Sequence, residues 1–363
     1  MKKNKNYVDL KDQPVPEGQH LLEVDDLKMY FHTEDGVVRA VDGVSYTLDR
    51  GETLGVVGES GSGKSVTAMT IMGLISMPPG KIEGGDVRYR GRSILEMTEE
   101  EMQHIRGNDI AMIFQDPMTS LNPVYKIGKQ VGEGLRLHRG YSKQEALKRA
   151  TELLDLVGIP EPEKRVNEYP HQFSGGMRQR VMIAMALACD PDILIADEPT
   201  TALDVTIQAQ IIELMQEMQE KNGNAIIMIT HDLGVVADMA DKIMVMYAGR
   251  PVEFGTAEEI FYESRHPYTW GLIRSIPEQA IDEKKPLTPI HGNPPSLMNL
   301  PEGCVFSPRC PYATDKCRKQ RPERFVTESC HYSACHYAGD PEFLKNAPVT
   351  SRTRKDSKKG GEA

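Results

Sequence analysis

The chain has 363 residues, of which 39% are hydrophobic and 26% charged, a composition typical of a globular protein with room for about two domains. Its 43 Lys and Arg residues against 53 Asp and Glu residues give a net charge of −10, which argues against a non-specific nucleic-acid binder because such proteins need a cationic surface. No apolar run approaches the roughly 20 residues that cross a bilayer, and no apolar segment follows the charged N-terminus, so we expect a chain that stays in the cytoplasm.

Strand-like and helical patterns alternate over most of the chain. Residues 1–20 are polar and contain proline and glycine, so we expect a flexible arm there. From Leu21 the pattern is strand-like, and the short apolar run 53–57 leads through a glycine-rich loop into a helical stretch. Further buried strands are predicted at 191–198 and 225–230, with a helical pattern between them. The alternation predicts an α/β fold with a mostly parallel sheet covered by helices.

The character of the chain changes beyond about Trp270. Prolines and glycines become more frequent and the periodicity fades, which predicts a small appended domain over 266–342 followed by a charged tail over 343–363. Five of the six cysteines lie in this appended segment, whereas Cys189 is predicted to be a small buried core residue.

The strongest motif is a P-loop that follows a predicted strand and opens a predicted helix. Its glycines let successive backbone N–H groups converge on phosphates, and the helix adds the positive end of its dipole. In this pattern the lysine reaches the β- and γ-phosphates and the last serine binds Mg²⁺. The motif consists of Gly58, Glu59, Ser60, Gly61, Ser62, Gly63, Lys64 and Ser65.

Two adjacent carboxylates end the apolar run Ile193-Leu194-Ile195-Ala196. Asp197 is predicted to hold Mg²⁺ through water, and Glu198 to activate the attacking water as a general base. Taken alone, two acids at a strand end also fit an ordinary turn before Pro199, but the P-loop favours the catalytic interpretation.

A second anion-binding pattern, Ser174-Gly175-Gly176, stands before a strongly apolar helical stretch. A hydroxyl, free N–H groups and a helix dipole make such a turn suited to phosphate, although a simple helix cap would have the same sequence. One nucleotide does not need two such sites. We therefore expect the second site to contact a nucleotide held by another subunit.

With these motifs in place, the chain resembles the ATP-binding cassette family over about residues 21–265. The P-loop resembles its Walker A loop, ILIADEP its Walker B strand and FSGGMRQR its signature motif. The resemblance implies a P-loop NTPase fold with an antiparallel N-terminal β-subdomain and a helical subdomain at about 116–180. It also implies ATP hydrolysis, with ATP and Mg²⁺ as ligands.

The resemblance extends to several single residues. Gln115, in IFQDP, looks like the Q-loop glutamine, which is placed near Mg²⁺ and the reacting phosphate. His231, in ITHD, looks like the switch histidine, and Asp204 like the D-loop aspartate. Phe31, or its neighbour Tyr30, lies where the family places an aromatic ring on adenine, and the alternation of strand side chains leaves the choice open.

Other features resemble the first ATPase subunit of oligopeptide and dipeptide importers. These are Met177 in place of the usual signature glutamine, the stretch TTALDVTIQAQI and the segment HPYTWGL. Importers of nickel or another small solute share them, so those cargoes remain an alternative. A non-transport ABC ATPase is less favoured, because such proteins usually fuse two cassettes or insert long coiled coils.

This resemblance implies a set of partners. They are a second, paralogous ATP-binding subunit, two transmembrane permease subunits contacted by segment 116–140, and an extracellular peptide-binding protein reached through the permeases, with no nucleic acid. The chain would then lie peripherally on the cytoplasmic face of the cell membrane.

The cysteine spacing indicates a metal site without deciding the metal. None of the spacings is the two-residue gap of a zinc ribbon, and crowded thiols in a reducing compartment favour metal over disulfides. Some related importer subunits carry a [4Fe–4S] cluster in this region. By that resemblance the ligands are Cys304, Cys310, Cys317 and Cys335, with Cys330 as an extra or alternative ligand, while zinc and no metal remain open.

Overall fold

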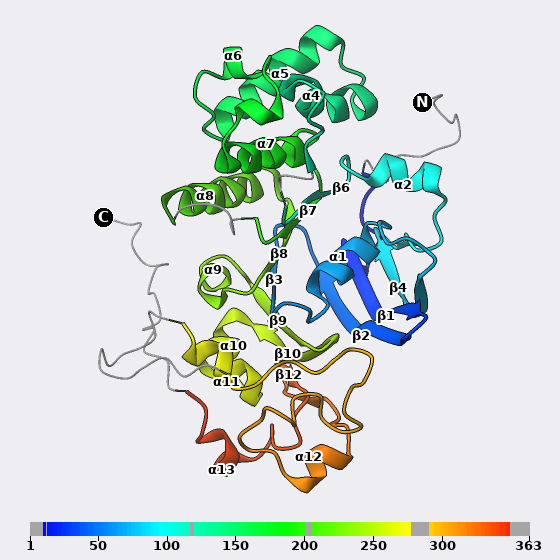
Figure 1. Ribbon diagram of the computed structural model, residues 1–363, viewed down its shortest axis with the longest axis vertical. Helices are drawn as coiled ribbons and strands as arrows, with labels where there is room; N and C mark the ends of the chain where they lie inside the picture. The colour runs from blue at the N-terminus through cyan, green and yellow to red at the C-terminus, as the bar shows by residue number, and fades with distance from the viewer. Residues whose placement is uncertain (1–9, 12, 117–119, 200–204, 277–289, 349–363) are drawn as a thin grey trace.

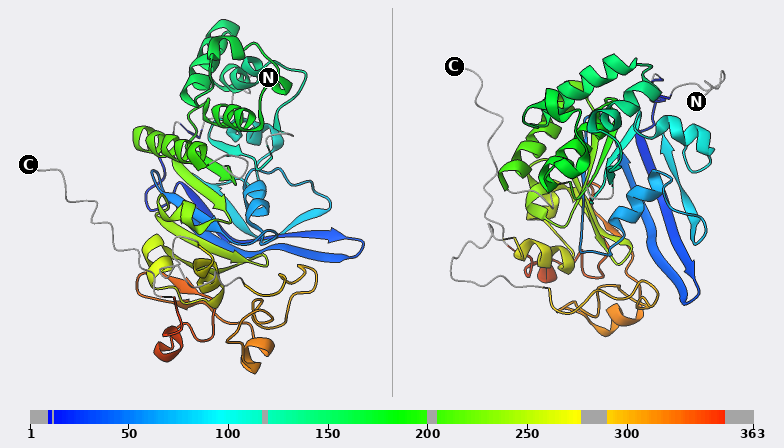
Figure 2. Two further views of the ribbon diagram at one scale, coloured as in Figure 1. Left: turned by 60° about the vertical axis from the view of Figure 1, so that its left-hand side comes forward. Right: turned by 45° about the horizontal axis from the view of Figure 1, so that its top comes forward.

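The computed structural model describes residues 10–11, 13–116, 120–199, 205–276 and 290–348 (Figure 1). Two β-sheets lie side by side, with a helical region at one end of the molecule and the C-terminal region at the other, as the turned views also show (Figure 2). The sequence prediction of a P-loop α/β cassette with an antiparallel subdomain, a helical subdomain and an appended C-terminal region is confirmed.

The smaller sheet is antiparallel and has the order β2-β1-β4-β5. Its strands are β1 (Leu22–Thr33), β2 (Gly36–Leu48), β4 (Gly80–Tyr89) and β5 (Arg92–Ser93). A tight turn joins β1 and β2, with Thr33 paired to Gly36. Buried and exposed residues alternate along much of these strands because one face is packed and the other is not.

The larger sheet has the order β11-β12-β10-β9-β3-β8-β7-β6. Its five strands β6, β7, β8, β3 and β9 run parallel, and the remaining strands extend it in antiparallel pairs. The bounds are β3 (Thr53–Val57), β6 (Ile110–Ile113), β7 (Ile193–Asp197), β8 (Ala225–Thr230), β9 (Lys242–Tyr247), β10 (Arg250–Thr256), β11 (Phe325–Val326) and β12 (Tyr332–Ser333).

Both faces of the parallel strands are covered, which explains why they are continuous apolar runs in the sequence. Successive side chains of β7 enter different hydrophobic clusters: Ile193 and Ile195 pack toward the antiparallel sheet, and Leu194 and Ala196 toward the helices. The helices near this sheet are α1 (Lys64–Ile71), α2 (Glu99–Ile105), α8 (Val205–Asn222), α9 (Leu233–Ala237) and α10 (Ala257–Tyr262).

The helical region lies at the end of the molecule coloured green in Figure 1. It contains α4 (Ile127–His138), α5 (Lys143–Leu156), α6 (Pro162–Arg165), the 3₁₀ turn η1 (Pro170–Gln172) and α7 (Gly175–Leu187). The predicted capping box at the start of α5 is present, because Ser142 and Glu145 bond to each other's backbone N–H groups.

The C-terminal region shares the hydrophobic core of the cassette. Phe306 packs against Tyr247 and Tyr268 with ring centroids 5.2 and 5.3 Å apart, and Tyr332 lies in a strand that pairs with β10. The region therefore extends the cassette sheet and core. Its helices are α11 (Pro267–Arg274), α12 (Asp315–Lys319) and α13 (Pro341–Leu344).

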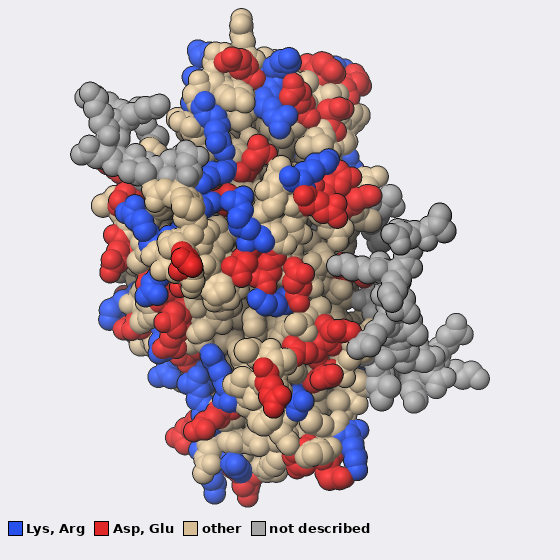
Figure 3. Space-filling model, turned by 180° about the vertical axis from the view of Figure 1, so that it is seen from behind, with Lys and Arg blue, Asp and Glu red and all other residues tan. Residues whose placement is uncertain are grey.

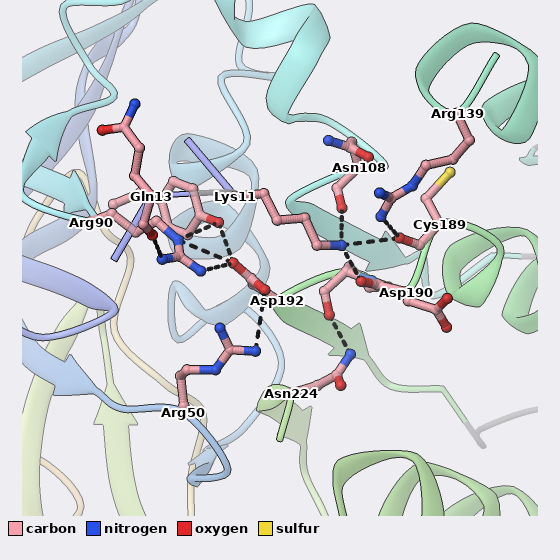
Figure 4. Close-up of polar contacts among 12 residues, drawn as sticks. Lys11, Gln13, Arg50, Arg90, Asn108, Arg139, Cys189, Asp190, Asp192 and Asn224 are labelled. Atoms are coloured by element: carbon pink, nitrogen blue, oxygen red, sulfur yellow. Dashed lines mark hydrogen bonds and ion pairs between the residues drawn. The ribbon is translucent and has the colours of Figure 1, made fainter. Parts of the chain in front are cut away.

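The N-terminal arm is anchored at its described residues, which differs from the flexible arm expected over 1–20. Leu10 is buried, and the Lys11 ammonium donates to the carbonyls of Asn108 and Cys189 at 3.2 and 3.1 Å and to that of Asp190 (Figure 4). These last two carbonyls follow the C-terminal end of α7, where a cation is favourable. Residues 1–9 lie outside the described residues.

The buried ion pair between Arg90 and Asp192 completes this contact. Its atoms lie 2.5 Å apart, both side chains are almost fully buried, and Arg90 also donates to the carbonyl of Gln13 (Figure 4). The arm thus joins the antiparallel sheet to the start of β7. Asp192 also accepts from the Tyr89 hydroxyl at 2.7 Å and lies 3.6 Å from Arg50, so removal of Asp192 is the change that would leave a buried charge, that of Arg90, without its carboxylate.

Two surface features bear on the partners of this chain. Lys and Arg side chains are interspersed with Asp and Glu over the face shown in Figure 3. Among the described ranges, no helix has the length and apolar character to cross a membrane.

Candidate functional site

The loop between β3 and α1 has a backbone that only glycine can adopt at two positions. Gly58 has φ +154°, and a Cβ there would lie 2.2 Å from the carbonyl oxygen of Met246. Gly63 has φ +101°, and a Cβ there would lie 2.3 Å from the carbonyl oxygen of Ala40. Side chains at these positions would force the loop open. The predicted P-loop therefore has the expected strand–loop–helix setting.

Lys64 lies at the centre of this loop. Its ammonium donates to the carbonyls of Gly58 and Glu59 at 2.7 and 3.0 Å, and the side chain is buried. Burial lowers the pKa of Lys64, while the carboxylates of Glu198, Asp197 and Glu59 act in the opposite direction. The loop thus surrounds a cation that faces the acidic strand end.

Ser65 and Asp197 meet at the start of α1. The serine hydroxyl donates to Asp197 Oδ1 at 3.0 Å, and Asp197 is only 4% exposed. Burial raises the pKa of Asp197, and the bond from Ser65 works against that rise. A hydroxyl and a carboxylate at this spacing are oxygen ligands of the kind that Mg²⁺ prefers.

The residues that follow three neighbouring parallel strands, β6, β7 and β8, meet at the Glu198 carboxylate. Gln115, just after β6, donates its amide N–H to Glu198 Oε2 at 3.0 Å, and His231 Nδ1, just after β8, lies 3.3 Å from Oε1. Glu198 itself follows β7 with φ +47°, and its N–H donates to the carbonyl of Ile229. The predicted catalytic residues are therefore brought together at the carboxyl edge of the sheet, where α/β folds place their ligands.

The second predicted phosphate site lies on a different part of the molecule. Ser174 caps α7 by accepting from the Met177 N–H at 3.3 Å, and both Ser174 and Gly175 are exposed. A Cβ on Gly175 would meet no atom within 4 Å. In the described ranges no hydrogen bond joins residues 174–177, which include Gly176, to the P-loop. The D-loop residues 201–204, including Asp204, lie outside the described residues.

The two aromatic candidates lie in β1 with different neighbours. The Tyr30 hydroxyl donates to Asp42 Oδ1 at 3.0 Å, and Asp42 is also paired with Arg250. Phe31 is half-buried and packs against the cluster between the sheets. The Tyr30 side chain is thus held by its hydrogen bond to Asp42. Phe31 has no polar group to hold it in this way, which makes it the better candidate to stack on an adenine ring.

Four of the predicted metal ligands converge in the C-terminal region. Cys304, Cys310, Cys317 and Cys335 line one cavity, and all of the chain's cysteines are free thiols. Cys330 is exposed and does not line the cavity. Within the part of the chain that the structure describes, no three His, Cys, Asp or Glu side chains are arranged to hold a metal ion.

Burial dominates the electrostatics of this cavity. It raises the pKa of the Cys310 thiol to about 11 and that of Cys335 to about 12. It lowers the pKa of His266 to about 3, so this side chain is neutral. The neutral ring caps α11, because its Nδ1 accepts from the Tyr268 N–H at 3.1 Å.

Two residues near the P-loop were not predicted from the sequence. The Tyr268 hydroxyl accepts from the backbone N–H of Glu59 at 2.9 Å, and Arg309 forms an ion pair with the Glu59 carboxylate. Tyr268 lies in the HPYTWGL segment, whose sequence indicates the family but not this contact. Arg309 has no local signal, since it is 250 positions from its partner.

Comparison with family models matches two parts of the chain. Residues 41–201 match the family described as "ABC transporter", and residues 252–317 match "Oligopeptide/dipeptide transporter, C-terminal region". The second match contains most of β10, the HPYTWGL segment and the first three cysteines of the cavity.

Curated relatives match over most of their length. The oligopeptide transport ATP-binding protein OppD of Bacillus subtilis (strain 168) is 58% identical over 86% of this chain and 87% of its own. The dipeptide transport ATP-binding protein DppD of Escherichia coli (strain K12) is 52% identical over 88% of this chain and 97% of its own. Among solved structures, the ATP-binding cassette MJ0796, a dimer bound to ADP and Pi in a post-hydrolysis state, is 29% identical with a TM-score of 0.60, covering 65% of this chain and 98% of that one.

Proposed function

Because the chain belongs to the ATP-binding subunits of oligopeptide and dipeptide ABC transporters, we propose that it binds and hydrolyses ATP at the loop between β3 and α1 to energise peptide uptake. The observation that carries this proposal is the convergence of Gln115 and His231 on Glu198, beside the P-loop. The named relatives transport peptides, so this cargo is favoured over nickel or another small solute.

In this proposal the P-loop binds the phosphates of ATP. Its backbone N–H groups and the N-terminus of α1 surround the phosphate oxygens, and the Lys64 ammonium exchanges its carbonyl partners for the β- and γ-phosphates. Ser65 and Gln115, together with Asp197 through water, would hold Mg²⁺. When bound, Mg²⁺ offsets phosphate charge as it develops in the reaction. Phe31 stacks on adenine.

Glu198 acts as the general base on the attacking water. Its carboxylate lies between the Gln115 amide and the His231 ring, which fix its two oxygen atoms in place. The left-handed backbone of Glu198, with φ +47°, departs from the extended conformation of the strand just before it. A carboxylate held by two polar groups at the edge of the sheet is positioned to accept a proton from water.

The exposed turn at Ser174-Gly175-Gly176 contacts ATP held by a second, paralogous subunit. It is exposed at the N-terminus of α7 and has unfilled space at Gly175, which suits docking of a phosphate from outside the chain. Two transmembrane permeases, contacted through segment 116–140, supply the pore and link to an extracellular peptide-binding protein. The chain is then peripheral on the cytoplasmic face of the membrane.

Replacement of Lys64 tests the ATP site. Lys64→Ala removes the ammonium that meets the phosphates, and we expect ATP affinity to fall by about 10- to 100-fold, the scale of a lost hydrogen bond to a charged group. Equilibrium titration with a fluorescent ATP analogue, and with ATP as competitor, gives the affinity. Lys81→Ala, at an exposed lysine of β4, is the control and is expected to bind as the unaltered protein does. Equal affinity for Lys64→Ala would remove the P-loop from the proposal.

Uptake itself is tested in the assembled complex. The chain is co-expressed with its permeases, second ATPase and binding protein and reconstituted in vesicles. We expect ATP-dependent accumulation of peptides and none of nickel, whereas uptake of nickel without peptide would reassign the cargo.

We propose further that Cys304, Cys310, Cys317 and Cys335 hold a [4Fe–4S] cluster. Four cysteine thiols around one cavity are the donor set of such a cluster. Ligands of a single zinc ion all lie about 2.3 Å from one atom. Among the described residues no three His, Cys, Asp or Glu side chains are placed to hold a metal ion, so metal analysis decides between a cluster, zinc and no metal. The cluster would stabilise a region rich in loops and short helices.

Metal analysis of anaerobically purified protein tests this site. We expect iron and acid-labile sulfide at about four each per chain and a brown colour. Cys310→Ser should bleach the colour and lower the melting temperature, whereas Cys330→Ser, at the exposed cysteine outside the cavity, should change neither. Stoichiometric zinc would select the alternative metal, and a preparation without metal would overturn both assignments.

A further inference from the structure

The side chain of Glu59, the second residue of the P-loop, is held by the C-terminal region. Arg309 Nη1 lies 2.5 Å from Glu59 Oε2 and Nη2 lies 3.0 Å from Oε1, a bidentate pair. The Arg309 side chain is 4% exposed and that of Glu59 is 29% exposed. Such a partly desolvated, bidentate pair is stronger and more directional than a surface ion pair.

Arg309 is held in place before it meets Glu59. Its Nε donates to the carbonyl of His291 at 3.0 Å, Nη2 to that of Ile290 at 3.1 Å and Nη1 to the Tyr247 hydroxyl at 3.3 Å. These groups come from the loop after the undescribed residues 277–289 and from the end of β9. The guanidinium therefore has one orientation, and lysine could not reproduce this set of donors.

The backbone N–H and the backbone carbonyl of Glu59 are both hydrogen bonded to side chains. Its backbone N–H donates to the Tyr268 hydroxyl at 2.9 Å, and its carbonyl accepts from Lys64 at 3.0 Å. The N–H of this residue is consequently bonded to a side chain of the C-terminal region. One P-loop residue thus connects the lysine of the ATP site to two buried side chains of the C-terminal region.

The charge of Glu59 has a consequence for ATP. A carboxylate in the P-loop would repel the phosphates, and its field reaches Lys64, whose pKa it helps to raise. We propose that Arg309 is a positioning residue of the ATP site, which offsets the Glu59 charge and fixes the first turn of the P-loop, so that ATP affinity depends on the C-terminal region. This inference rests on the proposed ATP site at residues 58–65.

A double-mutant cycle on the full-length protein separates this role from simple packing. We expect Arg309→Met to weaken ATP binding by about tenfold, because one charge of a partly buried pair is left uncompensated. ADP binding should weaken less, because ADP carries less charge than ATP. In a Glu59→Gln background the same change should alter ATP affinity by less than about twofold, since no carboxylate remains to be offset. A purely structural arginine would show the same loss in both backgrounds.

Two further variants keep the test decisive. Arg309→Lys retains the charge without the bidentate geometry and should give an intermediate loss, with thermal melting as the check on folding. Arg318→Met, at an exposed arginine paired with Asp315 in the same region, should bind ATP normally. If Lys64→Ala weakens ATP binding as expected and Arg309→Met binds like the unaltered protein, this inference is overturned alone. If Lys64→Ala binds normally, the proposed ATP site fails first.

Discussion

The Glu198→Gln variant is expected to hydrolyse ATP at least about 10²-fold more slowly while still binding it, because the amide cannot accept the proton of the attacking water. The substitution keeps the size of the side chain, and the Gln115 and His231 neighbours can still hydrogen bond to it. Binding is expected to persist because Lys64 and the P-loop backbone are unchanged. Phosphate release by the assembled transporter and equilibrium ATP binding are the two measurements.

A matched control distinguishes the loss of the general base from the loss of one negative charge elsewhere on the protein. Glu152→Gln removes an exposed carboxylate of α5 that is paired only with Arg149 among the contacts described, and it should hydrolyse ATP at the normal rate. Near-normal turnover by Glu198→Gln would show that another group accepts the proton. Loss of ATP binding by this variant would instead place Glu198 in the binding of the nucleotide.

The site was predictable where its residues form contiguous motifs or end parallel strands. The P-loop needs glycine at positions 58 and 63, and the motif shows this in the sequence. The structure confirms it, because the carbonyl oxygens of Met246 and Ala40 leave no room for a Cβ at these positions. Parallel strands bring their carboxyl ends to one edge, so residues after β6, β7 and β8 meet although they are far apart in sequence. Strand order alone thus determines much of this geometry.

The contacts of the two terminal regions could not be predicted in this way. Arg309 looks like any charged residue in a loop-rich segment, and only the packing of Phe306 against Tyr247 and Tyr268 brings it to Glu59. Lys11 likewise belongs to a polar stretch whose docking depends on the carbonyls at the end of α7. Such pairs join separate elements through tertiary packing, which leaves no periodic or local signal in the sequence.

Ser174→Arg is expected to prevent formation of the ATP-bound heterodimer while the subunit alone binds ATP with unchanged affinity. The serine is exposed at the N-terminus of α7 and has no described bond to the P-loop, so an arginine there would fill the space proposed for the partner's phosphate without touching this chain's own site. Analytical ultracentrifugation with the second subunit and ATP measures assembly.

Ser142→Arg is the matched control, because it also removes a serine cap, from α5, at a cost of about 1 kcal/mol, and should leave assembly intact. A Ser174→Arg subunit that remains folded but no longer binds ATP would mean that the turn contacts the nucleotide of its own chain, whereas normal assembly would exclude it from the interface.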